Sequence, residues 1–176
     1  MNEDIISKII KTNEEIARFW SNSSGWAPQE AADLLTKSRL DWQVELSKTL
    51  RLWDFQETRN GQLILAWANL GALVEGSLKL LLSVYYKTYQ TSEHKYESKG
   101  KLIDPDGLML EKLKQFYVKN NILKEEWINY IEFVQSRRNA IHAFRDRPLG
   151  DQFEFENSIE TYLDLLLEID GQLPYP

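Results

Sequence analysis

The sequence predicts an all-α fold, a bundle of five or six helices in a single domain over residues 1–176. Apolar residues recur three and four positions apart in several separate segments, which is the spacing of one helix face. No segment shows the period-two alternation of a strand, an internal repeat or a coiled-coil heptad. A chain of 176 residues with 43% apolar and 27% charged residues has ordinary globular composition and can bury a sizeable core.

The first half of the chain predicts three or four helical segments. Residues 4–22 carry isoleucines and aromatic residues at helical spacing, and a polar break follows. Residues 28–54 keep one apolar phase, so they form one long helix or two helices with a joint near Ser38. After a turn-like stretch at 58–61, residues 62–89 are apolar on nearly every side, which is typical of the central helix of a bundle.

The second half predicts a long loop and three further helices. Residues 91–107 are polar and turn-rich, which indicates the loop. Helical spacing then predicts a short helix at 108–118, a longer one at 124–144 and a last one at 156–170. The tail from Leu173 carries two prolines and cannot continue a helix.

Composition excludes several classes of protein and site. The absence of cysteine rules out disulfides and thiolate metal sites, and His94 and His142 are too far apart in sequence to suggest a metal site. No glycine-rich phosphate loop is present, so we expect no cofactor. The N-terminus lacks a basic signal region, and the longest uncharged apolar run, 62–74, is too short to span a bilayer. We therefore expect a cytoplasmic protein without a membrane partner.

Charge is distributed unevenly along the chain. The net charge is −6, but residues 148–176 hold seven acids and no lysine or arginine, so the rest is nearly neutral. Four arginines surround His142, namely Arg137, Arg138, Arg145 and Arg147. This basic cluster either holds phosphate groups, as a local patch can on an acidic protein, or pairs with the acidic C-terminal segment. Charge alone leaves both alternatives open.

The stretch 136–144 brings arginine, asparagine and histidine onto the end of an amphipathic helix. On an ideal helix Arg138 lies within about 40° of His142, whereas Arg137 lies about 140° away unless the helix distorts or ends there. Each arginine continues one of two apolar flanks of the helix. One flank therefore packs in the bundle and the other meets something else, for which a second copy of the chain is the simplest candidate.

These residue types suit the cleavage of RNA phosphodiesters. An imidazole can take a proton from a ribose 2′-hydroxyl or give one to the leaving oxygen. A guanidinium matches phosphate oxygens and stabilises charge that develops in the transition state. Asn139 would position the phosphate or fix the imidazole tautomer, and no metal is required. The plainer alternative, which spacing alone favours, is a histidine at a helix C-terminus beside arginines paired with acids.

Glu75 stands inside the apolar segment 62–89, where two interpretations are open. It is either a solvent-facing residue at a gap between neighbouring helices or a buried acid that orients one of the arginines near His142. A single acid carries little information, which favours the solvent-facing interpretation.

The stretch from Arg137 to His142 consists of an arginine, four further residues and a histidine, and it stands late in an all-α bundle. In this it resembles the HEPN superfamily of prokaryotic toxin, phage-defence and RNA-processing domains. The resemblance implies a homodimer whose two motif helices form one composite site, and a metal-independent endoribonuclease that leaves a 2′,3′-cyclic phosphate. It implies that Arg137 stabilises the phosphate and His142 is the general acid or base. Arg138, Asn139, Arg145 and Glu75 would be supporting or RNA-binding groups, and the partners would be RNA, a second copy and an antitoxin protein.

The sequence departs from the family pattern at two positions. The residue after the motif arginine is Arg138, where asparagine, aspartate or histidine is common, so helical spacing favours Arg138 in the cleft and motif spacing favours Arg137. Phe144 stands where one subgroup has a tyrosine that its antitoxin modifies. Silencing by nucleotide transfer to that position is therefore not expected.

Three functions are consistent with the sequence. The first is a dimeric HEPN-like ribonuclease used as a toxin or in phage defence. The second is a non-catalytic HEPN-like module that binds RNA, a nucleotide or a protein, which the low basicity favours. The third is a helical dimerisation domain in which the arginines pair with the acidic C-terminal helix.

Overall fold

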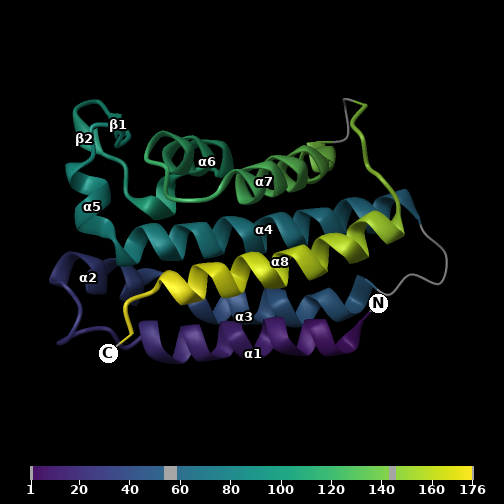
Figure 1. Ribbon diagram of the computed structural model, residues 1–176, viewed down its shortest axis with the longest axis horizontal. Coiled ribbons are helices and arrows are strands. Elements are labelled where there is room, and N and C mark those ends of the chain that lie inside the picture. The colour runs from purple at the N-terminus through teal and green to yellow at the C-terminus, as the bar shows by residue number, and fades with distance from the viewer. Residues whose placement is uncertain (1, 54–58, 143–145, 176) are drawn as a thin grey trace.

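The computed structural model describes residues 2–53, 59–142 and 146–175. These ranges contain eight α-helices, three short 3-10 helices and one two-stranded hairpin (Figure 1). The all-α prediction is confirmed. The helices outnumber the expected five or six, because the chain breaks at Ser38 and again at Tyr85.

The first half begins with three α-helices and a 3-10 turn. They are α1 (Glu3–Trp20), α2 (Gln29–Lys37), α3 (Leu40–Thr49) and η1 (Leu50–Trp53). The break between α2 and α3 falls at Ser38, whose backbone is extended. Of the two alternatives for residues 28–54, the jointed one is correct.

The central helix α4 (Asn60–Val84) starts earlier than expected, since Asn60 and Gly61 belong to its first turn rather than to a connecting turn. It ends before Tyr85, and the short α5 (Tyr86–Thr91) takes the chain in a new direction (Figure 1).

Residues 91–107 contain more structure than a loop. The strands β1 (Glu97–Ser98) and β2 (Lys101–Leu102) pair antiparallel, and η2 (Pro105–Gly107) follows. Lys99 and Gly100 between the strands both have positive φ, which is the geometry of a two-residue hairpin turn. The sequence shows no alternation here because each strand is only two residues long.

The last part of the chain supplies α6 (Leu110–Lys119), α7 (Glu125–Arg138), η3 (Asn139–His142) and α8 (Gln152–Gln172). Helix α8 starts four residues earlier than expected because the Asp151 side chain caps it by accepting a 2.9 Å hydrogen bond from the backbone N–H of Glu154.

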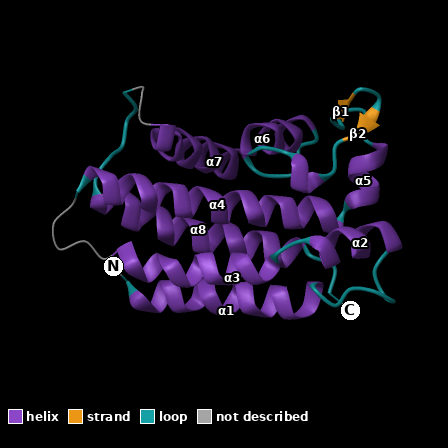
Figure 2. Cartoon of the chain, turned by 180° about the vertical axis from the view of Figure 1, so that it is seen from behind, coloured by secondary structure: helices purple, strands orange, loops and turns teal. Residues whose placement is uncertain are grey.

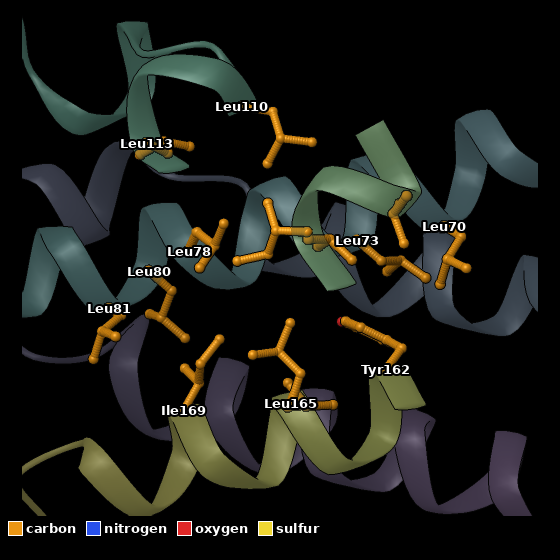
Figure 3. Packing of buried hydrophobic residues seen from close by; sticks show 14 of the residues in the cluster. Leu70, Leu73, Leu78, Leu80, Leu81, Leu110, Leu113, Tyr162, Leu165 and Ile169 are labelled. Atoms are coloured by element: carbon orange, nitrogen blue, oxygen red, sulfur yellow. The ribbon is translucent and has the colours of Figure 1, made fainter. Parts of the chain in front are cut away.

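Helix α4 is at the centre of the bundle and contacts α2, α3, α6, α7 and α8. Helices α6 and α7 lie end to end over one side of it, whereas α8, α3 and α1 lie on the other, as both views show (Figures 1 and 2). Figure 3 shows Leu165 and Ile169 of α8 pointing toward α4 from one side, and Leu110 and Leu113 of α6 from the other. These residues are all buried.

Among the described residues, only α4 is long and apolar enough to cross a membrane by length and composition. The helix continues past Glu75, where the uncharged run ends, so its length does not exclude a membrane span. In the bundle 61% of its most apolar window is buried, and the core helix of a soluble protein has the same properties.

Candidate functional site

Helix α7 tightens into the 3-10 helix η3 at Asn139, directly after the two arginines. A 3-10 helix turns about 120° per residue, so His142 shares a face with Asn139 and stands about 100–120° from Arg138. The 40° expected for an ideal α-helix is therefore wrong. Because the helix changes type before the histidine, Arg138 and His142 leave the backbone in different directions.

Arg138 lies against the surface of α4. A Cβ added at Gly71 would stand 2.5 Å from Arg138 Cδ and 3.0 Å from its Cβ, so the arginine stem occupies the space that this glycine leaves. The guanidinium then reaches the next turn of α4, where Nη1 donates a 2.7 Å hydrogen bond to Glu75 Oε2. Gly71 and Glu75 thus fix Arg138 at its stem and at its head.

Glu75 binds two cations. Its other carboxylate oxygen, Oε1, is 2.8 Å from Nζ of Lys79, one turn further along α4. Only 12% of the Glu75 side chain is exposed, against 27% for Arg138 and 26% for Lys79. The acid is therefore beneath the two cations, and the surface that they present to solvent is positive.

The environment of Glu75 keeps it ionised. Burial raises the pKa of its carboxyl, but the hydrogen bonds and positive charges of Lys79 and Arg138 outweigh burial and hold the pKa below its usual range. The solvent-facing interpretation of Glu75 is thus wrong. The acid orients an arginine of the basic cluster, and that arginine is Arg138.

Arg137 points elsewhere and is bound to the C-terminal segment. Its Nε donates a 2.8 Å hydrogen bond to Glu154 Oε1, its Nη2 donates to the same oxygen, and its Nη1 donates to the Pro148 carbonyl at 3.1 Å. The guanidinium also stacks on Phe133, 4.8 Å from the ring centre. For Arg137, pairing with the acidic segment is therefore the observed alternative, and 14% of its side chain is exposed.

His142 is exposed at the end of η3. Within the described residues no hydrogen bond or ion pair joins it to Arg137, Arg138 or Glu75. Asn139 is half-buried beside it in the same turn. The expected contributions of Arg145 and Phe144 fall on residues outside the described ranges.

The starts of α4 and α8 and the end of α7 lie at one end of the bundle (Figure 1), and the elements there carry exposed apolar side chains. Ile141 precedes the histidine in η3, Leu65 is in the second turn of α4, and Phe153 is in the first turn of α8. Ile141 is 45% exposed next to His142, so the surface at the histidine is partly apolar.

The sequence contains a pattern that indicates the contact of α4 with a long side chain such as Arg138. Gly71, Glu75 and Lys79 are spaced four residues apart and hence lie on one face of α4. A glycine one turn before a lone acid indicates room for a long side chain that ends on that acid.

The described residues contain no group of three histidine, aspartate or glutamate side chains placed to hold a metal ion. Comparisons of the chain with protein-family models, with curated proteins and with solved structures give no match.

Proposed function

We propose that the protein is a metal-independent endoribonuclease of HEPN type, used in the cytoplasm as a toxin or in phage defence. The observation that carries the proposal is an exposed histidine that has no partner among the described residues and is placed one short turn after an arginine whose position is fixed. A structural histidine at a helix end is expected to contact a carbonyl or an acid, and no such contact to His142 is found in the part of the chain described.

Arg138 is the arginine that we assign to the RNA phosphate. It shares one carboxylate with Lys79, so the three groups together carry an excess positive charge. Arg137, which motif spacing would place at the phosphate, has its donors directed at Glu154 and Pro148. Its proposed role is to hold the C-terminal segment against α7.

The reaction that fits these groups is attack of a ribose 2′-oxygen on its own 3′-phosphate. One imidazole takes the 2′-hydroxyl proton and a second proton donor protonates the leaving 5′-oxygen, which yields a 2′,3′-cyclic phosphate and a 5′-hydroxyl. Because each chain has one histidine in this stretch, the second donor is His142 of a second copy. Ile141, which is exposed in η3 next to His142, gives such a copy an apolar side chain to bind.

A non-catalytic binding module is the second candidate, and the contacts of Arg137 favour it. A motif arginine already neutralised by Glu154 is less available to a transition state. In this case RNA, a nucleotide or an antitoxin-like protein would bind at the surface formed by Arg138, Glu75 and Lys79 (the Arg138 face), and RNA would not be cleaved.

The test is an RNA cleavage assay in EDTA that compares the wild type with His142→Ala and follows the product ends. His94→Ala is the matched control, since His94 is the other histidine of the chain and lies between α5 and β1. The proposal predicts cyclic phosphate ends from wild type and His94→Ala, and no product from His142→Ala of unchanged fold and assembly. Equal cleavage by all three proteins, or none by any, would exclude it.

A further inference from the structure

A pocket of about 430 Å³ opens beside the Arg138 face, in the size range of small-ligand sites. The joint between α2 and α3 forms one wall, the middle of α4 forms the floor, and η2 closes the third side. Lys79, which pairs with Glu75 on one side, lines this pocket on the other. The pocket and Arg138 are thus connected through one shared carboxylate.

The floor of the pocket is held by Gln43. A Cβ added at Gly76 would stand 2.2 Å from Gln43 Oε1, so this glycine lets the side chain lie across α4. Gln43 Nε2 donates to the Leu73 carbonyl at 2.8 Å and to Ser77 Oγ at 3.3 Å. The amide therefore ties α3 to α4 beneath the opening and pre-forms the pocket.

Two planar groups line the rim. Trp42 is 57% exposed, an unusual fraction for the largest apolar side chain. The Arg39 guanidinium lies 4.2 Å from its ring centre, and Asp41 accepts from Arg39 Nε at 2.8 Å and from Nη2 at 2.5 Å. An exposed tryptophan with an oriented guanidinium is the kind of platform on which nucleobases stack.

Positively and negatively charged side chains complete the lining of the pocket. Lys37 is exposed and forms no ion pair with the described residues, and Lys79 lines the pocket from α4 with its amine 2.8 Å from Glu75 Oε1. Asp106 of η2 supplies a carboxylate. Lysines bind phosphate oxygens, whereas a carboxylate accepts hydrogen bonds from ribose hydroxyls or base N–H groups.

We infer that this pocket binds a nucleoside monophosphate unit, with its base on Trp42 and its phosphate between Lys37 and Lys79. The unit is either a free nucleotide or one nucleotide of an RNA strand that continues to Arg138. Only the strand form rests on the proposed ribonuclease function.

The experiment measures binding in a His142→Ala background, so that cleavage does not interfere. A labelled single-stranded RNA is titrated by fluorescence anisotropy, and AMP and UMP are titrated separately by calorimetry. The pocket variants are Trp42→Ala and Lys79→Gln. The matched control is Lys8→Gln, because Lys8 also pairs with an acid four residues away, Asp4, but lies on α1.

Trp42→Ala is expected to weaken binding about tenfold or more, the factor associated with loss of one base–aromatic stack. Lys79→Gln is expected to weaken it and to lower the salt dependence of RNA binding by about one charge. Lys8→Gln is expected to bind RNA, AMP and UMP with the same affinity as the His142→Ala protein. If the pocket variants lose affinity for AMP or UMP, the pocket is a site for a free nucleotide. If they lose affinity for RNA alone, the pocket is a site for one nucleotide of an RNA strand.

The inference is overturned if neither pocket variant changes the affinity for RNA, AMP or UMP. If wild type still cleaves RNA in that case, the ribonuclease proposal stands without the pocket. If AMP binds through Trp42 while no RNA is cleaved, the pocket stands and the ribonuclease proposal fails.

Discussion

Two residues of α4, Gly71 and Glu75, determine the direction in which Arg138 points. Arg138 fits over Gly71 and ends on Glu75, whereas Arg137 turns to Glu154. Sequence spacing places both arginines next to the same histidine, but the two guanidinium groups have separate counter-ions. Arg138 is therefore suited to binding a ligand, whereas Arg137 stabilises the fold.

The substitution Gly71→Ala tests the first of these contacts. The added methyl would be too close to the Arg138 stem, which includes its Cβ, so the arginine or its backbone must shift. We expect a loss of about 1–3 kcal/mol in the free energy of unfolding and weaker RNA binding. Gly171→Ala is the control, because its added methyl meets nothing within 4 Å. Urea titration would measure both variants, and equal stability would contradict the contact.

The lowered pKa of Glu75 predicts how stability depends on pH. A carboxyl whose pKa is lower in the folded state stabilises the fold above its ordinary pKa of about 4.3, and loses that contribution as pH falls through the folded-state value. Glu75→Gln should therefore cost roughly 1–3 kcal/mol at neutral pH, and the difference from wild type should shrink in acid. Glu93→Gln, at an exposed carboxylate, should show little difference at any pH. A pH-independent difference would contradict the ion pairs.

At the scale of elements, Arg137 connects the end of α7 to the start of α8. It binds Glu154 in the first turn of α8 and the Pro148 carbonyl in the segment before it. This arrangement matches the ion-pair part of the dimerisation-domain hypothesis for Arg137, whereas Arg138 pairs with α4 instead of the C-terminal helix.

A double-mutant cycle with Arg137→Met and Glu154→Gln measures the strength of this connection. The pair is partly shielded, so we expect a coupling energy of roughly 1 kcal/mol by urea unfolding. The exposed Lys8–Asp4 pair, treated in the same way, should couple more weakly. A coupling of zero between Arg137 and Glu154 would release Arg137 for the phosphate role that motif spacing assigns to it.

Local periodicity predicted the elements better than it predicted their contacts. Helical spacing located the bodies of α1, α4 and α8, because apolar side chains recur along each of them, but it missed the early starts of α4 and α8 and the end of α4 before Tyr85. The joint at Ser38 stayed open, since one helix or two keep the same phase. Arg138 is 63 residues away from Glu75 along the chain, so the spacing of Gly71 and Glu75 can indicate room for a long side chain but cannot identify which one fills it. The change to a 3-10 helix at Asn139 occurs where the chain packs on α4.

At the scale of the whole molecule, the proposed site needs two copies of the chain. Ile141→Glu places a charge in the apolar surface beside His142, so we expect it to abolish dimer formation and RNA cleavage together. Val118→Glu on α6 is the control, since the two side chains are 45% and 47% exposed. Analytical ultracentrifugation would report the mass of each protein. A monomeric wild type that cleaves RNA would refute the composite site.

The central position of α4 has a consequence for hydrogen exchange. A helix that is packed against most of the other helices cannot open alone, so its amides should exchange only when the whole protein unfolds. The β1–β2 hairpin and α5, at the edge of the bundle, should exchange far sooner by local opening (Figure 2). Since Gly71, Glu75 and Lys79 all belong to α4, the Arg138 face is built on the segment whose amides exchange most slowly. A ligand arriving there would meet charges already in place, and its binding would require little ordering of the backbone.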